Sequence, residues 1–171
     1  MLESAKKRVL MLIEMQEDDF IVSKTDLKGR ITYGNEIFIK MSGYSEKELL
    51  FAPHNILRHS EMPAVVFKLL WQRLKEKSFV NAYVINRCKN GDYYWVFANV
   101  TTSLDKNGNT MGYYSVRRKP KSSAITTVEV LYKELLRIEK ASGIIASEKY
   151  LENFLNDQGV SYDELIISLQ K

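Results

Sequence analysis

Residues 53–63, which read Pro-His-Asn-Ile-Leu-Arg-His-Ser-Glu-Met-Pro, hold the densest group of chemically versatile side chains in the sequence. His54, Arg58, His59 and Glu61 all lie within this short stretch. A guanidinium donates paired hydrogen bonds to planar anionic groups, and an imidazole can donate, accept or bind a metal. We therefore expect this segment to border a binding site.

A second polar segment, residues 86–95, reads Asn-Arg-Cys-Lys-Asn-Gly-Asp-Tyr-Tyr-Trp. An Asn-Gly pair between two runs of strand-forming residues indicates a tight hairpin turn. Because side chains alternate across a strand, Val84, Asn86 and Cys88 are expected on one face. The two polar segments together predict a pocket formed by a loop and a sheet.

The elements that position these segments follow from the spacing of apolar residues. Runs of β-branched and aromatic residues predict two strands before the polar loop and three after it. Apolar residues at helical spacing, with Asn35 and Ser45 as N-caps, predict helices between the two groups of strands. The expected elements are strands at 20–25 and 30–33, helices at 36–41, 46–50 and 63–75, and three strands within 79–119. This order predicts an α+β fold, in which a five-stranded antiparallel sheet carries short helices on one face and encloses a cavity.

Both ends of the chain predict helices outside this sheet. Residues 1–19 have a basic start and a short apolar run, which predict an N-terminal amphipathic helix or cap. Residues 121–171 predict a helical C-terminal tail, in which Gly143 ends one helix and Ser147 and Ser161 begin two more. An apolar stripe runs along the first of these helices at Val128, Leu131, Leu135 and Ile138. This stripe either docks on the sheet domain or contacts a second chain.

Composition narrows the class of protein. The chain has 171 residues, a formal net charge of +4 and one cysteine. Its basic residues are scattered among acidic ones, which argues against a nucleic-acid surface. The sequence contains no run of about 18 apolar residues, and a lone cysteine forms no internal disulfide, so we expect a cytoplasmic location. No nucleophile–base pairing or Gly-rich phosphate loop is recognisable, so we expect no enzyme.

Several short motifs occur in a characteristic order. They are Gly29-x-Ile-Thr-x-x-Asn35, Ser42-Gly-Tyr-Ser45, Glu48-Leu49, Pro53-His-Asn55, Arg58-His59, Met62-Pro63 and Asn90-Gly-Asp-x-Tyr-Trp-Val96. This set resembles the PAS sensory domains. The string Pro-His-Asn-x-x-Arg-His-x-x-Met-Pro is more specific and is similar to the type found in the bacterial aerotaxis receptor Aer and in CetB-like energy-taxis proteins. The resemblance covers roughly residues 20–120, which we expect to form a PAS sensory domain.

The resemblance implies a redox sensor that binds FAD non-covalently. Arg58 and His59 match the family's Arg-His pair needed for flavin binding, and Glu61 stands where Aer has an acid. Asn86 matches an Asn beside the isoalloxazine ring, which also has a counterpart in the LOV photoreceptors. Arg117 occupies the place of the LOV glutamine that reports the flavin state. These residues are the expected cofactor contacts.

Four further residues complete the candidate cofactor site. Asn35 belongs to the shared motif, and His54 lies near the position of the reactive LOV cysteine. Trp71 and Tyr93 are expected to supply an aromatic wall, because Aer has a Trp where this chain has Val80.

Partners follow from the same resemblance. One PAS domain with a short helical tail is similar to the soluble half of a two-protein energy-taxis system. The output would then pass through a separate membrane-bound, CetA-like chemotaxis transducer, with the sensor cytoplasmic and held at the membrane by that partner. A homodimer is an open alternative, as are two other functions. A cavity filled by side chains would make a cofactor-free interaction module, and a histidine in the cavity would suit a haem-binding gas sensor.

Overall fold

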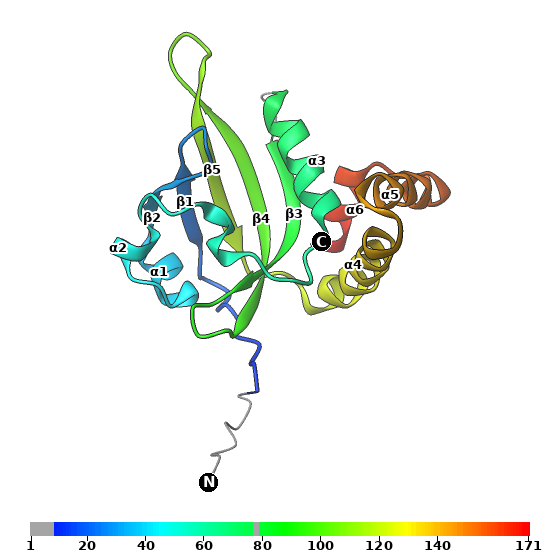
Figure 1. The fold of residues 1–171 in the computed structure, drawn as a ribbon, viewed down its shortest axis with the longest axis horizontal. Helices are drawn as coiled ribbons and strands as arrows, with labels where there is room; N and C mark the ends of the chain where they lie inside the picture. Colours follow the sequence, from blue (N-terminus) through cyan, green and yellow to red (C-terminus); the bar gives the residue numbers. More distant parts are fainter. Residues whose placement is uncertain (1–8, 77–78) are drawn as a thin grey trace.

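The computed structural model describes residues 9–76 and 79–171. A five-stranded antiparallel sheet in the order β2-β1-β5-β4-β3 forms its centre (Figure 1). The strands are β1 (Ile21–Thr25), β2 (Ile31–Gly34), β3 (Phe79–Arg87), β4 (Tyr93–Leu104) and β5 (Thr110–Arg118). The predicted α+β fold with a five-stranded antiparallel sheet is therefore confirmed.

The segment between β2 and β3 lies over one face of this sheet. It contains α1 (Glu36–Ser42), α2 (Glu46–Leu49), the 3₁₀ helix η1 (His54–Leu57) and α3 (Ala64–Lys75). Asn35 caps α1 through its side chain, and Ser45 forms a capping box with Glu48 at the start of α2, both as predicted. Gly43 ends α1 with a φ of 71°, a conformation that glycine adopts without the steric cost of a Cβ atom.

The register of β3 and β4 sorts their side chains onto two faces. Asn86 lies opposite Tyr94, and Val84 opposite Val96, on the inner face towards the helices. Tyr83 pairs with Phe97 on the outer face, where both are buried. β3 is thus covered on both sides along most of its length.

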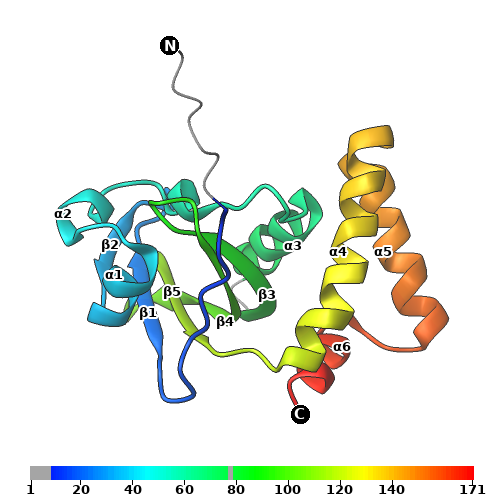
Figure 2. The same ribbon diagram turned by 90° about the horizontal axis from the view of Figure 1, so that it is seen from below.

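The tail covers the outer face of β3 and the side of α3. Its helices are α4 (Ser122–Ser142), α5 (Ile144–Gln158) and α6 (Tyr162–Leu169). Figure 2 shows α4 and α5 beside α3, on the side of the molecule opposite to α1 and α2. Val128, Leu131 and Leu135 are buried in one hydrophobic cluster with Tyr83 and Trp95. Most of the predicted apolar stripe therefore docks on the chain's own sheet.

Two local predictions are wrong. The expected amphipathic helix at 1–19 is absent from residues 9–19, where the backbone of Met11 and Ile13 bonds to Tyr93 at the start of β4. Pairing with a strand gives these backbone groups hydrogen bonds that a short isolated helix retains only marginally. Residues 1–8 lie outside the described part of the chain. Ser147 does not begin α5, because the chain turns at Gly143 and the buried Ser147 hydroxyl donates to the Leu135 carbonyl at 3.2 Å.

No helix within residues 9–76 and 79–171 combines the length and apolar character needed to cross a bilayer.

Candidate functional site

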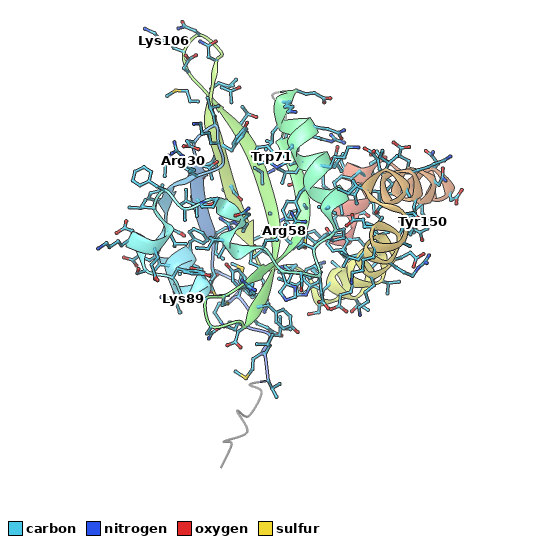
Figure 3. All side chains as sticks on the ribbon, in the orientation of Figure 1. Arg30, Arg58, Trp71, Lys89, Lys106 and Tyr150 are labelled. Atoms are coloured by element: carbon cyan, nitrogen blue, oxygen red, sulfur yellow. The ribbon has the colours of Figure 1, made fainter. Side chains whose placement is uncertain are left out.

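A cavity of about 320 Å³ lies between the inner face of the sheet, η1 and α3. This volume is at the lower end of the roughly 300–1,000 Å³ typical of small-molecule pockets. Figure 3 shows Arg58 and Trp71 in the region between α3 and the strands. Five of the predicted site residues line the cavity, and they are His54, Arg58, Trp71, Asn86 and Arg117.

Arg117 on β5 is the only arginine among the buried residues that the structure describes, with 2% of its surface exposed. Its Nη2 donates to Ser23 Oγ and lies 3.4 Å from His54 Nε2, and its guanidinium stacks on the Phe38 ring at 4.8 Å. Nε and Nη1 have no hydrogen-bond partner, and no described carboxylate forms an ion pair with it. Burial lowers the pKa of Arg117 to about 10, so the side chain stays cationic at neutral pH. A buried cation without a counter-ion is costly and indicates that something anionic or acceptor-rich belongs beside it.

His54 from η1 is held in its neutral form. Its Nε2 lies 3.2 Å from Ser23 Oγ and faces the Arg117 guanidinium, which can only donate, so Nε2 acts as an acceptor and the proton belongs on Nδ1. The ring also stacks on Phe38 at 5.9 Å. Burial, with the nearby Arg117 charge, lowers the pKa of His54 to about 3.

Asn86, which lines the cavity, and Tyr94, which lies outside its lining, are two further buried polar residues near this end. The Asn86 amide nitrogen and the Tyr94 hydroxyl are buried and lack hydrogen-bond partners. They lie directly opposite one another on β3 and β4, and burial raises the pKa of Tyr94 above its usual value, against the opposing charge of Arg117. Buried polar groups are nearly always satisfied in native proteins, so the unpaired nitrogens of Asn86 and Arg117 make this end of the cavity a candidate ligand position.

The other end of the cavity reaches solvent. Lys28, Asn55, Arg58 and Trp71 line it and are exposed. The Arg58 guanidinium lies over the Phe67 ring at 4.3 Å, and Trp71 meets the edge of Tyr113 at 5.3 Å. This mouth is therefore both aromatic and cationic.

His59, Glu61 and Tyr93 lie outside the residues that line the cavity. Arg58 forms an isolated antiparallel bridge with Asn86, and neighbours in an extended segment point to opposite sides, so His59 points away when Arg58 points in. The His59 ring packs on Tyr93 at 5.3 Å, and its Nδ1 accepts the Glu61 backbone N–H at 3.2 Å. Burial lowers the pKa of His59. The two predicted neighbours Arg58 and His59 are thus divided between the cavity and the edge of the sheet.

The side chain of Asn35 is used to cap α1 and to hold the start of β1. Its Oδ1 accepts the backbone N–H groups of Val22 and Phe38 at 3.0 and 3.1 Å, and its Nδ2 donates to the Phe20 carbonyl at 2.7 Å. The amide therefore ties α1 to the start of β1, and Asn35 lies outside the residues that line the cavity. Val80, where Aer has Trp, is 1% exposed and also lies outside the lining.

Sequence reasoning missed several residues of the site. Ser23 belongs to its polar inner end, while Lys28 and Phe67 lie near its mouth. Alternation along β1 places Ser23 on the face of the buried Ile21, which is a signal present in the sequence. The inward direction of Tyr94 could not be predicted from the sequence, because it depends on the register of the β3–β4 hairpin. A shift by one residue would turn Tyr93 inward instead.

The polar groups of the cavity are suited to binding a ligand. Within the described part of the chain, no group of three or more His, Cys, Asp or Glu side chains is arranged to hold a metal ion. Cys88 lies outside the cavity lining, its thiol donates to the Met41 carbonyl at 3.1 Å, and burial raises its pKa to about 11. The site offers donors and one fixed positive charge to a flat ligand edge that carries acceptors.

Comparisons with known proteins agree with this fold. A family model described as "PAS fold" matches residues 31–117. Over 121 residues, 71% of this chain, the sequence is 40% identical to the aerotaxis receptor of Escherichia coli (strain K12), of which the match covers 24%. It is 28% identical over 109 residues to the nitrogen fixation regulatory protein of Klebsiella pneumoniae, covering 64% of this chain and 22% of that protein. The chain thus spans about a quarter of the length of these relatives.

Solved structures show the same architecture. The light-state structure of the blue-light photoreceptor Aureochrome1 LOV is similar with a TM-score of 0.55 and 21% identity, covering 71% of this chain and 93% of that one. The PAS domain of a protein from Colwellia psychrerythraea is similar with a TM-score of 0.54 and 18% identity, covering 58% and 85%. At this level of identity, the likeness concerns the fold.

Proposed function

Since this chain belongs to the PAS fold family, we propose that it is a sensor for aerotaxis or energy taxis that holds FAD in the cavity on the inner face of its sheet. The motif-based prediction of a PAS domain of the aerotaxis-receptor type is confirmed. The observation that carries the proposal of a flavin is the set of buried nitrogen donors without a described partner on two residues that line the cavity, Asn86 and Arg117.

The chemistry of these donors fits one edge of a flavin ring. The pyrimidine edge of isoalloxazine carries two carbonyl oxygens, which accept hydrogen bonds, and an imide N–H between them, which donates one. The Asn86 amide and the free Arg117 nitrogens would meet these acceptors and lose their desolvation cost. In a cofactor-free module we would expect this end of the cavity to be filled or its polar groups to be paired, so the open space and the unpaired nitrogens of Asn86 and Arg117 support a ligand.

The size of the cavity implies that only part of an FAD molecule would lie inside it. A space of about 320 Å³ suits a ring system, whereas the rest of a dinucleotide belongs at the open end. Lys28 and Arg58 provide cations there, and phosphates are recognised by such side chains. Trp71 and Phe67 provide apolar walls between the two ends.

A bound flavin would supply reversible electron transfer. The Arg117 guanidinium stabilises negative charge that enters the cavity, since unit charges about 4 Å apart interact by about 4 kcal/mol at an effective dielectric constant of 20. Moving a two-state protein from 1:99 to 99:1 requires about 5.5 kcal/mol. One buried cation thus supplies much of the energy that a redox-dependent change of conformation requires. Arg117 also contacts β1 through Ser23 and η1 through His54, so such a change would reach two elements at once.

The proposed output is a separate membrane-bound chemotaxis transducer of the CetA type. Sequence similarity to the aerotaxis receptor supports this role, and the partner would keep the sensor at the cytoplasmic side of a membrane. Co-sedimentation of the chain with membranes that contain or lack such a transducer tests the partnership. Equal sedimentation with both membranes would exclude it.

A visible spectrum after reconstitution with FAD tests the ligand, with Asn86→Ala as the decisive variant. Asn81 is on the same strand but on the outer face, where its Oδ1 accepts from Asn99 at 3.0 Å, so Asn81→Ala is the matched control. Flavin absorption that survives in Asn81→Ala and is lost in Asn86→Ala supports the proposal. A Soret band would indicate haem, and a colourless wild type would indicate a cofactor-free module.

A further inference from the structure

Helix α3 lies between the cavity and the tail. In both ribbon views it stands between the sheet and α4–α5 (Figures 1 and 2). Phe67, Leu70, Trp71 and Leu74 from this helix line the cavity. Its opposite side meets the tail, so a displacement of α3 changes the cavity wall and the tail contacts together.

Glu139 from α4 caps the beginning of α3. The N-cap residue of α3 is Pro63, which makes no side-chain capping bond. Instead, the two oxygens of the Glu139 carboxylate accept the backbone N–H groups of Ala64 and Val65, each at 2.9 Å. The first turn of a helix has unpaired N–H groups and a partial positive charge, both of which a carboxylate satisfies. The cap is thus supplied by a residue more than 70 positions away in the sequence.

The other two tail helices hold α3 in a related way. Glu148 of α5 pairs with Lys68 at 2.5 Å, and Asp163 of α6 pairs with Arg73 at 2.8 Å. Each of the three tail helices therefore gives one acidic side chain to α3, at its first, second and last turns. Exposed ion pairs contribute little on their own, so the backbone cap by Glu139 is the contact of greatest effect.

We propose that Glu139 is a positioning residue for the cavity: its cap fixes the first turn of α3 from the tail side, and this cap is coupled through the helix to ligand binding on the other side. The capped first turn fixes the start of the helix. Phe67 stands one turn further on and carries the Arg58 guanidinium on its ring. The backbone of Arg58 in turn pairs with the backbone of Asn86 in an isolated β-bridge. A chain of contacts therefore leads from the capped turn through Phe67 and Arg58 to Asn86 in the cavity. Coupling between two sites is reciprocal, so each event must strengthen the other.

The tail stays docked without this carboxylate. Leu135, Leu151 and Ile166 are buried in the cluster that joins the tail to the outer face of β3. A change at Glu139 therefore alters the position of α3 without releasing the tail, and the variant is expected to fold. The nature of the ligand used below rests on the proposed function, whereas the coupling does not.

Glu139→Gln in the full chain tests the proposal, with two readouts. Flavin affinity is measured by titration, and hydrogen exchange is measured at the amides of Ala64 and Val65. We expect about fivefold weaker flavin binding, the factor that corresponds to loss of a typical helix cap, and faster exchange at both amides. Glu134→Gln is the matched control on the same helix, because Glu134 pairs only with Arg137 of α4 among its described contacts. In the control, both readouts should equal those of the wild type.

Reciprocity gives the second arm. Flavin should slow exchange at Ala64 and Val65 in the wild type and have less effect in Glu139→Gln. Unchanged flavin affinity in Glu139→Gln, with faster exchange alone, would show a merely structural cap and overturn the proposal.

If the wild type binds no flavin, the proposed function fails. The coupling is then tested with Val84→Phe, whose larger side chain occupies part of the cavity in place of a ligand. Val84 lines the cavity, so the larger side chain fills part of it from within. Slower exchange at Ala64 and Val65 in Val84→Phe, abolished by adding Glu139→Gln, would support the coupling without any ligand. Equal exchange rates at these two amides in Val84→Phe and in the wild type would contradict the coupling.

Discussion

The two faces of β3 and β4 differ in how their polar groups are satisfied. On the outer face, the Tyr132 hydroxyl donates to the Tyr83 carbonyl at 2.7 Å, and the Tyr83 hydroxyl bonds to Gln170 at 3.1 Å. On the inner face, Tyr94 and Asn86 have polar atoms without partners. Tyr162 in α6 is an exception on the tail side, with an unpaired hydroxyl of its own.

The outer face is thus a filled interior with mostly satisfied polar groups, whereas the inner face has a cavity and unsatisfied polar groups. Where the chain supplies its own covering layer, side chains fill the space and mostly satisfy one another. Where the covering layer leaves a cavity, donors of one kind collect around a single buried cation. Unpaired groups at such a place trade stability of the free protein for affinity towards a ligand.

The largest effect on stability is expected on the outer face. Leu135 is fully buried between the tail and the sheet, so Leu135→Ala should lower the free energy of unfolding by about 3 kcal/mol. Val130→Ala on the same helix is the control, because Val130 is 69% exposed and should cost little. Urea denaturation followed by circular dichroism measures both. Equal losses in the two variants would mean that the tail does not dock as described.

The inner face should respond in the opposite direction. Arg117→Met removes a buried charge that has no counter-ion, so the ligand-free protein should become more stable by about 1–2 kcal/mol. Flavin affinity should fall at least about 100-fold, or roughly 2.7 kcal/mol. Arg118→Met is the matched control, because Arg118 is the next residue of β5 and lies outside the cavity, over Phe97. Destabilisation of the ligand-free Arg117→Met protein would contradict the comparison.

Acid should weaken the inner face first. His54 stays neutral in the folded protein down to about pH 3, whereas an unfolded histidine takes up a proton near pH 6.5. Stability is therefore complete above pH 6.5 and is lost as the pH falls from 6.5 towards 3, by about 1 kcal/mol at pH 5.5. Because the ring borders a cavity that water enters, this figure is an upper value. Urea midpoints at pH 7.5 and 5.5 should lie closer together in His54→Gln, where His59, whose pKa burial also lowers, still contributes, and an unchanged difference would show that His54 is not responsible.

The smallest effects come from single hydroxyl groups. Tyr132→Phe removes a buried hydrogen bond and should cost about 1 kcal/mol, while Tyr94→Phe removes an unpaired hydroxyl and should be neutral or slightly stabilising without ligand. Thermal denaturation of both variants in the absence of ligand measures the contrast. A loss of equal size in Tyr94→Phe would show that its hydroxyl is satisfied in solution.

Periodicity in the sequence was sufficient to predict the strands and most helix boundaries. Asn-Gly turns located the strands of the second half, and Asn35, Ser45 and Ser161 capped helices as expected. These signals are local, because a turn or a cap depends on residues only a few positions apart. The start of α5 was misplaced because the burial of Ser147 depends on packing between α4 and α5.

The site was predicted only in part, since its composition depends on register and on long-range contacts. Alternation correctly placed Asn86 inside, but the direction of His59 depends on a bridge between Arg58 and β3. The cap from Glu139 joins segments more than 70 residues apart, and no local pattern in the sequence announces it. The resemblance to PAS domains named Arg117, but its lack of a counter-ion became evident only in three dimensions.

The buried guanidinium of Arg117 on the inner face of the sheet also bears on the amount of this protein in a cell. A chain that folds without the proposed ligand must bury that charge without a counter-ion, and it would remain closer to unfolding than a chain that binds the ligand. Quality-control proteases remove such molecules faster than loaded ones. If the chain binds a flavin as proposed, flavin supply during translation would also affect the abundance of the protein.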